Sequence, residues 1–135
     1  MDAPRQICEK LRRALADRAD VHLALLFGSL ARGAAGPDSD VDLAVAAPGV
    51  DLLQLRATLC IAVGREVDLL DLNDATIPMA EQLLRDGIAV HEGIRGAGAR
   101  WRSHTLTSME TDRPWYARMR EAWLRRVKEE GFKHG

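Results

Sequence analysis

The sequence predicts one domain of the α/β or α+β class, in which helices alternate with a few short strands. Short apolar runs bounded by glycine, proline or aspartate alternate with longer segments whose apolar residues recur every three or four positions. The chain has 135 residues and 47% of them are hydrophobic, which is enough for one sizeable core but not for a second substantial domain. Helices interleaved with strands in this order are typical of a sheet that helices cover.

The first half of the chain is predicted to hold two helical segments and two strands. In order, they are a helix over 4–19, a strand over 21–27, a helical turn over 29–32, a loop over 33–39 and a strand over 41–46. Ile7, Leu11 and Leu15 recur at every fourth position of the first helix and therefore share one side. Pro48 and Gly49 end the second strand.

The second half adds two helices, two strands and a tail. In order, they are a helix over 51–63, a strand over 67–72, a helix over 78–86, a strand over 88–91, a linker or mobile loop over 93–113 and a helix over 114–130. Asp51 is predicted to cap the first of these helices, and Gly87 to end the second. We expect residues 1–92 to form the main domain and 114–135 a basic amphipathic helix. The segment 93–113 between them is polar and contains glycine, which predicts the linker.

The charges are distributed unevenly along the chain. The net charge is −1, yet residues 93–135 carry ten Lys and Arg against five Asp and Glu, and residues 1–92 carry nine against fifteen. Such an asymmetry marks either a surface for a partner or a nucleic acid, or a solvated helix face. Composition alone does not choose between them.

The sequence also indicates the cellular compartment in which we expect the protein. No apolar stretch approaches the ~20 residues needed to span a bilayer, and charged residues interrupt the N-terminal segment where a secretory signal would be apolar. Cys8 and Cys60 lie in apolar helical patterns and are predicted to be reduced, buried thiols, and no Cys/His cluster has zinc-ligand spacing. We therefore expect a cytoplasmic protein.

The stretch over residues 27–45 carries most of the chemistry. A glycine and a serine, Gly28 and Ser29, close one apolar run, and Asp40 and Asp42 stand at the mouth of the next. Residues two apart in a strand point to the same face, so the two carboxylates lie side by side while the alternate apolar residues face a core. Two such charges repel each other unless a cation lies between them, and oxygen-only ligands favour Mg²⁺. A glycine-serine turn that suits phosphate, facing this pair, suggests phosphoryl or nucleotidyl transfer.

This arrangement resembles the active-site signature of the DNA polymerase β-like nucleotidyltransferase superfamily. That signature is a Gly-Ser turn, a spacer, Asp-x-Asp on a strand and a third carboxylate on a later strand. The spacer Leu-Ala-Arg-Gly is typical of the minimal nucleotidyltransferases, small proteins that are usually antitoxins paired with a HEPN-domain toxin. The resemblance continues through 65–72 and 80–92, with one departure at His91, where tyrosine is common. It implies the nucleotidyltransferase fold, a small mixed sheet of about four strands flanked by helices, here with a C-terminal helical tail.

Two residues compete for the place of the third carboxylate. Asp68 and Asp71 lie three apart on one predicted strand, so they face opposite ways and only one can look toward Asp40 and Asp42. Parity alone does not choose, because leucine residues flank both. The resemblance favours Asp68, in its Val-Asp-Leu context.

The resemblance also implies roles for the residues of this signature. Asp40, Asp42 and Asp68 would ligate Mg²⁺ in a two-metal site and form the catalytic set, with Asp68 able to take the proton of the acceptor hydroxyl. The nucleotide-binding residues that it implies are Gly28, Ser29, Arg32 and Ser39. Arg32 either neutralises phosphate charge or braces the loop through an aspartate, and one sequence does not place its guanidinium.

At the level of function, the resemblance implies a Mg²⁺-dependent nucleotidyltransferase that transfers AMP from ATP to a tyrosine hydroxyl of a HEPN RNase toxin and so acts as its antitoxin. Two alternatives stay open. The protein can neutralise a toxin by binding alone, or it can be a nucleotidyltransferase with a small-molecule acceptor. The polymerase and aminoglycoside-modifying branches carry additional domains that we do not expect here.

The predicted C-terminal helix carries a candidate docking surface. Trp115, Met119, Trp123 and Val127 follow one another at intervals of four residues and share one side of the helix. This stripe either packs back on the domain or docks on a partner such as the HEPN toxin, and stacking against single-stranded nucleic acid is the least favoured use. We expect no membrane partner.

Overall fold

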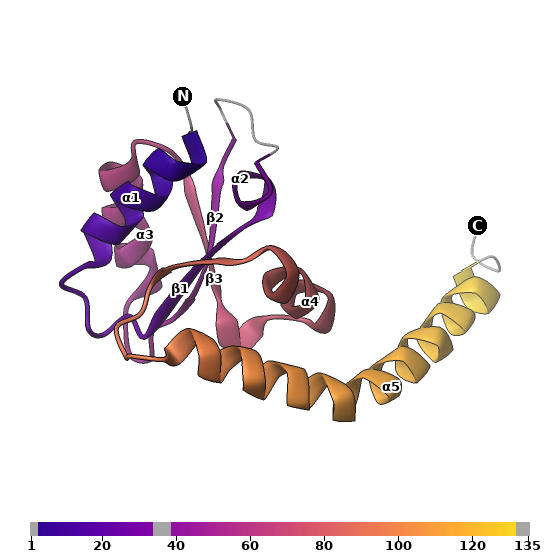
Figure 1. Ribbon diagram of the computed structural model, residues 1–135. Coiled ribbons are helices and arrows are strands. Elements are labelled where there is room, and N and C mark those ends of the chain that lie inside the picture. The colour runs from indigo at the N-terminus through magenta and orange to yellow at the C-terminus, as the bar shows by residue number, and fades with distance from the viewer. Residues whose placement is uncertain (1–2, 34–38, 132–135) are drawn as a thin grey trace. The chain divides into compact units, whose positions relative to one another are not determined.

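The computed structural model describes residues 3–33 and 39–131, and its elements follow the predicted order (Figure 1). The elements are α1 (Ala3–Leu15), β1 (Leu23–Phe27), α2 (Gly28–Ala31), β2 (Val41–Ala46), α3 (Leu52–Val63), β3 (Val67–Asp71), the 3-10 turn η1 (Leu72–Asp74), α4 (Ile77–Asp86), β4 (Ile88–His91) and α5 (Ala97–Gly131). The chain forms two compact units, Met1–Trp101 and Arg102–Gly135. The first unit contains the whole sheet.

The sheet is mixed, with the strand order β3-β2-β1-β4. β1 is antiparallel to both β2 and β4, whereas β2 and β3 run parallel. The carboxyl end of β1 and the amino ends of β2 and β3 therefore lie at the same edge of the sheet, where α2 follows β1 (Figure 1). This four-stranded mixed sheet with flanking helices confirms the predicted fold class.

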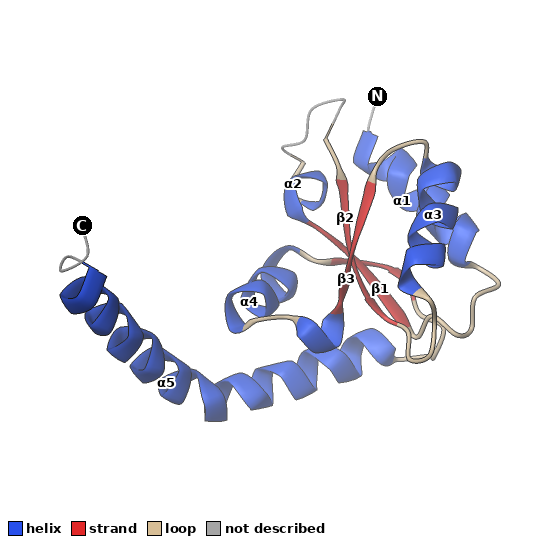
Figure 2. Ribbon diagram, turned by 180° about the vertical axis from the view of Figure 1, so that it is seen from behind, coloured by secondary structure: helices blue, strands red, loops and turns tan. Residues whose placement is uncertain are grey.

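Helices cover both faces of the sheet, with α1 and α3 on one side and α4 on the other (Figure 2). On the α1/α3 face, Val41, Leu43 and Val45 of β2 are 0% exposed, as their alternation predicted. They pack in a core with apolar residues of the two helices. The residues that α1 and α3 contribute to this core include Leu11, Leu15, Leu55 and Leu59.

The core on the α4 face is smaller. Its buried members are Leu23, Leu25, Ala44, Leu72 and Leu83, and Ala97 and Trp101 of α5 pack against it. The side chains of β2 and β3 that face this core are those in phase with Ala44, so Asp42 and Asp68 belong to the same face. The apolar packing thus gives way to carboxylates where β2 and β3 begin.

The helix ends follow local capping rules. The Asp51 carboxylate accepts hydrogen bonds from the amides of Leu53 (3.1 Å) and Gln54 (3.3 Å), which confirms the predicted cap of α3. Gly64, with φ +76°, ends the same helix in the left-handed conformation that glycine adopts at little cost. α1 ends at Leu15, four residues before the predicted end, because residues 16–20 turn back toward β1.

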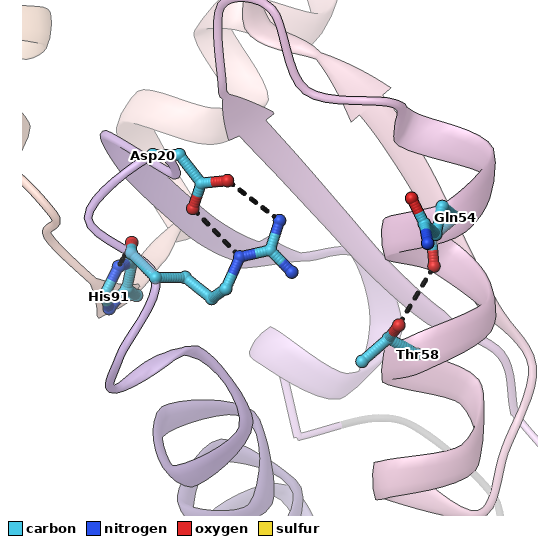
Figure 3. Close-up of polar contacts among 5 residues, drawn as sticks. Asp20, Gln54, Thr58 and His91 are labelled. Carbon is cyan, nitrogen blue, oxygen red and sulfur yellow. Dashed lines mark hydrogen bonds and ion pairs between the residues drawn. The ribbon is translucent and has the colours of Figure 1, made fainter.

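Two polar contacts lie at the end of the sheet remote from Asp42 (Figure 3). Arg18 forms a two-pronged ion pair with Asp20 (2.9 and 3.0 Å), and its carbonyl oxygen lies 2.9 Å from Nε2 of His91 in β4. Beside this pair is an open hollow of about 450 Å³, also lined by Pro48 and the start of α3. His91 therefore ties β4 to the segment that follows α1, well away from the carboxylates.

The main difference from the expected secondary structure lies in 93–113. This segment was predicted as a linker, yet α5 begins at Ala97 and continues through it to Gly131. The start of α5 has local support, because Glu92 Oε2 accepts a hydrogen bond from the amide of Gly98 (3.2 Å) and Trp101 packs on the core. The segment contains several glycines, which have a low helix propensity, and the sequence therefore predicted a linker there. No helix within the described residues is long and apolar enough to cross a membrane.

Candidate active site

Asp42 lies at the centre of the sheet edge where β1 ends and β2 and β3 begin. In the sheet register it pairs with Phe27 of β1 on one side and with Asp68 of β3 on the other. Residues that pair directly in a parallel ladder project to the same face, and neighbouring strands are only about 4.8 Å apart. The fold therefore sets the side chains of Asp42 and Asp68 side by side.

The same register separates the two candidates for the third carboxylate. Asp71 pairs with Val45, whose side chain is buried on the α1/α3 face, so Asp71 and Asp42 lie on opposite faces. The Asp71 carboxylate instead accepts a hydrogen bond from the amide of Asn73 (2.9 Å) and caps η1. The pairing favours Asp68 over Asp71, and the catalytic role of Asp68 stays a prediction.

Gly28 approaches Asp42 from the end of β1. Its φ is +75°, and a Cβ added there would collide with the carboxylate of Asp42, whose Cγ would lie 3.2 Å away. Any residue with a side chain at this position would therefore displace Asp42. Ser29 is half-buried in the following turn, and Arg32 is exposed at the end of α2. The turn that was predicted from Gly28 and Ser29 thus lies against the predicted metal ligand.

The pKa of the Asp42 carboxyl depends on its burial and on the other charged side chains at this edge. Burial raises the pKa of the Asp42 carboxyl first, the negative charges of Asp68 and Asp40 raise it further, and the guanidinium of Arg32 opposes them. Asp40 itself is exposed and lies just before β2, which begins at Val41. Three carboxylates and one guanidinium therefore influence one another here.

The donor set suits a hard divalent cation. Within residues 3–33 and 39–131, no three His, Cys, Asp or Glu side chains converge tightly enough to enclose a metal ion as they stand. Asp40, Asp42 and Asp68 nevertheless offer only carboxylate oxygens, which Mg²⁺ prefers, and they stay open enough to leave room for water and phosphate oxygens. The mutual repulsion that raises the pKa of Asp42 is the kind that a bound cation relieves. The residues therefore fit Mg²⁺.

Two predicted features fall partly outside the description. Ser39 is half-buried, and its carbonyl oxygen accepts a hydrogen bond from Arg65 Nη1 (3.2 Å), but residues 34–38, between Ser39 and α2, lie outside the described residues. In the tail, the side chains of Trp115, Met119 and Val127 are likewise not described. Trp123, from the same predicted stripe, is 57% exposed.

Sequence reasoning missed two arginines at this edge. Arg56 of α3 donates to the carbonyl oxygen of Val67 (2.8 Å), and Arg65 donates to Ser39. These contacts span 11 and 26 residues of chain, so no local pattern predicts them. Only the position of Arg65, two residues before the strand that carries Asp68, could have pointed to it.

The sequence profile of the polymerase β nucleotidyltransferase family matches residues 9–93, more than half of the chain. The chain belongs to this family. The match confirms the resemblance that residues 21–92 suggested, and it spans every predicted site residue from Gly28 to Asp68. No curated protein sequence matches this chain.

Solved structures with a similar fold include toxin–antitoxin complexes. One chain of a toxin–antitoxin structure with AMP-PNP is 24% identical with a TM-score of 0.67, and the match covers 86% of this chain and 98% of that one. A chain of an MntA–HepT toxin–antitoxin structure is 22% identical over 88% and 98%, with a TM-score of 0.62. A third is from a tri-AMPylated Shewanella oneidensis HEPN toxin in complex with an MNT antitoxin, at 22% identity over 91% and 99% and a TM-score of 0.58. At these identities the likeness shows a shared fold.

Proposed function

We propose that this nucleotidyltransferase transfers AMP from ATP to a tyrosine hydroxyl of a HEPN-domain RNase toxin, with Mg²⁺, and thereby acts as the antitoxin of that pair. The observation that carries the proposal is the pairing of Asp42 with Asp68 directly beside Gly28. Two of the similar structures support the chemistry, since one holds AMP-PNP and the other a tri-AMPylated toxin.

The reaction needs an activated hydroxyl and a stabilised leaving group. The acceptor oxygen attacks the α-phosphorus of ATP, the bond from this phosphorus to the bridging oxygen of the β-phosphate breaks, and pyrophosphate leaves. Asp68, at the rim of the site, accepts the proton of the hydroxyl. Mg²⁺ held by Asp40, Asp42 and Asp68 supplies positive charge to the phosphate oxygens when it is bound.

The other residues of the edge act on the phosphates. Gly28 leaves the space beside Asp42 free of side-chain atoms, so the backbone at Gly28 and Ser29 can approach the triphosphate closely. Arg32 is exposed, and its positive charge lowers the pKa of Asp42, which supports a role for Arg32 in neutralising phosphate charge. Ser39, half-buried just before β2, completes the proposed nucleotide-binding set.

The helical tail is the proposed docking surface for the partner. Trp123 and Leu124 are 57% and 46% exposed, and Arg118, Arg125 and Arg126 are exposed on the same stretch of α5. Large apolar and arginine side chains together are typical of residues that dominate the energy of protein interfaces. We extend the surface to Trp115 and Met119 from the sequence alone.

The test is stabilisation by Mg²⁺ and ATP together. Saturating ligand should raise the melting temperature of the protein by about 5 °C or more, because binding to the folded state alone stabilises it by mass action. Asp40→Asn/Asp42→Asn should remove that shift, whereas the control Asp17→Asn/Asp74→Asn removes two exposed carboxylates elsewhere and should keep it. A full shift in the first double variant would refute the proposed site.

A further inference from the structure

β3 is the edge strand of the sheet next to β2, and alternate residues of it, beginning with Val67, turn both backbone groups outward. The carbonyl oxygen of Glu66 accepts a hydrogen bond from the amide of Val41 (2.9 Å), so Glu66 points toward β2. Successive residues of a strand direct their backbone groups to alternate sides, so the N–H and C=O of Val67 point away from the sheet. Backbone N–H and C=O groups that lack hydrogen-bond partners on an edge strand can pair with another chain.

Two side chains of α3 satisfy both of these groups. Arg56 Nε donates to the carbonyl oxygen of Val67 at 2.8 Å, and the amide of Val67 donates to Cys60 Sγ at 3.3 Å. Arg56 also forms an ion pair with Glu66, with Nη2 2.7 Å from Oε2. Arg56 and Cys60 are four residues apart on the helix, so they lie on the same side and act on the same residue of the strand.

This contact reaches the proposed metal ligand through the backbone. The carbonyl group of Val67 belongs to the peptide unit that enters Asp68, and that unit is planar. The bond to the Val67 carbonyl orients this unit, and the bond from the Val67 amide orients the unit before it. Together they restrict the direction in which the Asp68 side chain leaves the backbone.

Arg65 makes a similar contact to the backbone just before β2. Its Nη1 donates to the carbonyl oxygen of Ser39 at 3.2 Å, and this carbonyl belongs to the peptide unit that enters Asp40. Between the two contacts lies the hydrogen bond from Val41 to Glu66. The segment 65–67 thus joins the backbone before one proposed ligand to the backbone before another.

We propose that Arg56 and Arg65 are positioning residues of the metal site: they hold the peptide units that enter Asp68 and Asp40 and so set the spacing of the carboxylates around Asp42. The inference rests on the proposed function, because it assigns a purpose to the spacing only if these carboxylates bind Mg²⁺. Groups that orient metal ligands typically change metal affinity by about 10- to 100-fold when they are removed.

The test measures the Mg²⁺ concentration that gives half of the ATP-dependent rise in melting temperature. Arg56→Met keeps the aliphatic part of the side chain and removes both hydrogen bonds, and it should raise this midpoint by about tenfold. Arg65→Met should raise it less, because its bond is longer and Asp40 is exposed. Arg56→Lys keeps a single donor for Val67 and should restore part of the loss.

Two controls separate positioning from a general loss of stability. Asp51→Ala removes the cap of the same helix and destabilises it without touching β3, and Arg85→Met removes an equivalent ion pair, with Asp86 at 3.3 Å. Both should leave the Mg²⁺ midpoint within about twofold of the wild type. A tenfold rise in Asp51→Ala as well would overturn the positioning role, since destabilised α3 alone would then explain the effect.

The remaining outcomes distinguish this inference from the function on which it rests. A wild-type protein that shows no Mg²⁺-dependent shift with ATP overturns both. A wild-type shift that Asp42→Asn abolishes, together with an unchanged midpoint in Arg56→Met and Arg65→Met, overturns the positioning role and leaves the proposed function standing.

Discussion

The two faces of the sheet are built from the same strands but differ in what they bury. On the α1/α3 face, the apolar side chains continue to the first residue of β2, and Val41 is as fully buried as Leu43 and Val45. On the α4 face of β2, the buried core residue nearest the edge is Ala44, and the next position toward the edge is Asp42, with Asp68 beside it on β3. Along β2, one face is therefore apolar from end to end, whereas the other becomes acidic at the edge where the strand begins.

This difference separates stability from function within a single strand. Because side chains alternate along β2, Val41 and Leu43 can hold the fold together while Asp42, between them, carries a charge that the fold disfavours. The raised pKa of Asp42 shows that the folded state disfavours the charged form of this carboxyl relative to the unfolded chain. Substitutions on the two faces should therefore affect different measurements.

The largest effect is expected from Asp68→Ala on the acidic edge. Transfer of label from α-labelled ATP to the acceptor should fall by about 10³-fold or more, because the proposed roles of Asp68 as metal ligand and as proton acceptor are lost together. Asp71→Ala, on the other face and engaged in capping η1, should stay within about tenfold of the wild type. The reverse ranking would mean that the pairing of Asp42 with Asp68 does not define the site.

On the apolar face, Leu43→Ala should lower the free energy of unfolding by about 2–5 kcal/mol, because a fully buried leucine leaves a cavity. Leu70→Ala, a half-buried position on the opposite face, should cost about half as much. Urea unfolding measures both values. Equal losses would show that the α4 face carries as much of the stability as the α1/α3 face.

Gly28→Ala and Gly64→Ala form a matched pair, since both glycines have positive φ (+75° and +76°). Each substitution should cost about 1–2 kcal/mol of stability from the backbone alone. A Cβ at Gly64 meets nothing within 4 Å, whereas at Gly28 it meets the carboxylate of Asp42. Only Gly28→Ala should therefore lose the stabilisation by Mg²⁺ and ATP in a thermal-shift measurement, and its retention would place the nucleotide elsewhere.

The smallest expected effect is on the metal-free protein. Because the pKa of Asp42 is raised, the folded state binds a proton at pH values where the unfolded chain has lost it, so stability falls as pH rises through that range. Asp42→Asn carries no charge and should melt about 1–3 °C higher than the wild type at pH 7 without divalent cations. At about pH 3, where Asp42 is protonated in both states, the gain should disappear. A wild-type protein that melts higher at pH 7 would contradict the assigned cost of this charge.

Most of the fold was predictable from local signals. β2 has the predicted bounds, and α3 begins after the Asp51 cap and ends at Gly64, because capping and alternation depend on neighbours in sequence. The helix through residues 97–113 was not predictable in this way. Its start depends on Glu92 and on the packing of Trp101, which are contacts of the folded chain.

In the candidate site, too, the features that depend on neighbours in sequence were predictable and the long-range pairings were not. Gly28, Asp40 and Asp42 stand within one short stretch, so their spacing already predicted a turn facing two carboxylates. The choice between Asp68 and Asp71 depends on the register of β2 with β3, a long-range pairing that strand periodicity does not determine. The residues alone left both Asp68 and Asp71 open, and only the resemblance to the family favoured Asp68.

The central claim is that the acidic edge transfers AMP to a protein partner, and the mass of that partner tests it most directly. A HEPN toxin co-expressed with the wild-type protein should gain the mass of one or more AMP units in intact-mass spectrometry. Co-expression with Asp42→Asn should leave the toxin at its unmodified mass while the complex still forms. An unmodified toxin in both cases, neutralised equally by the wild type and by Asp42→Asn, would contradict the account and favour neutralisation by binding alone.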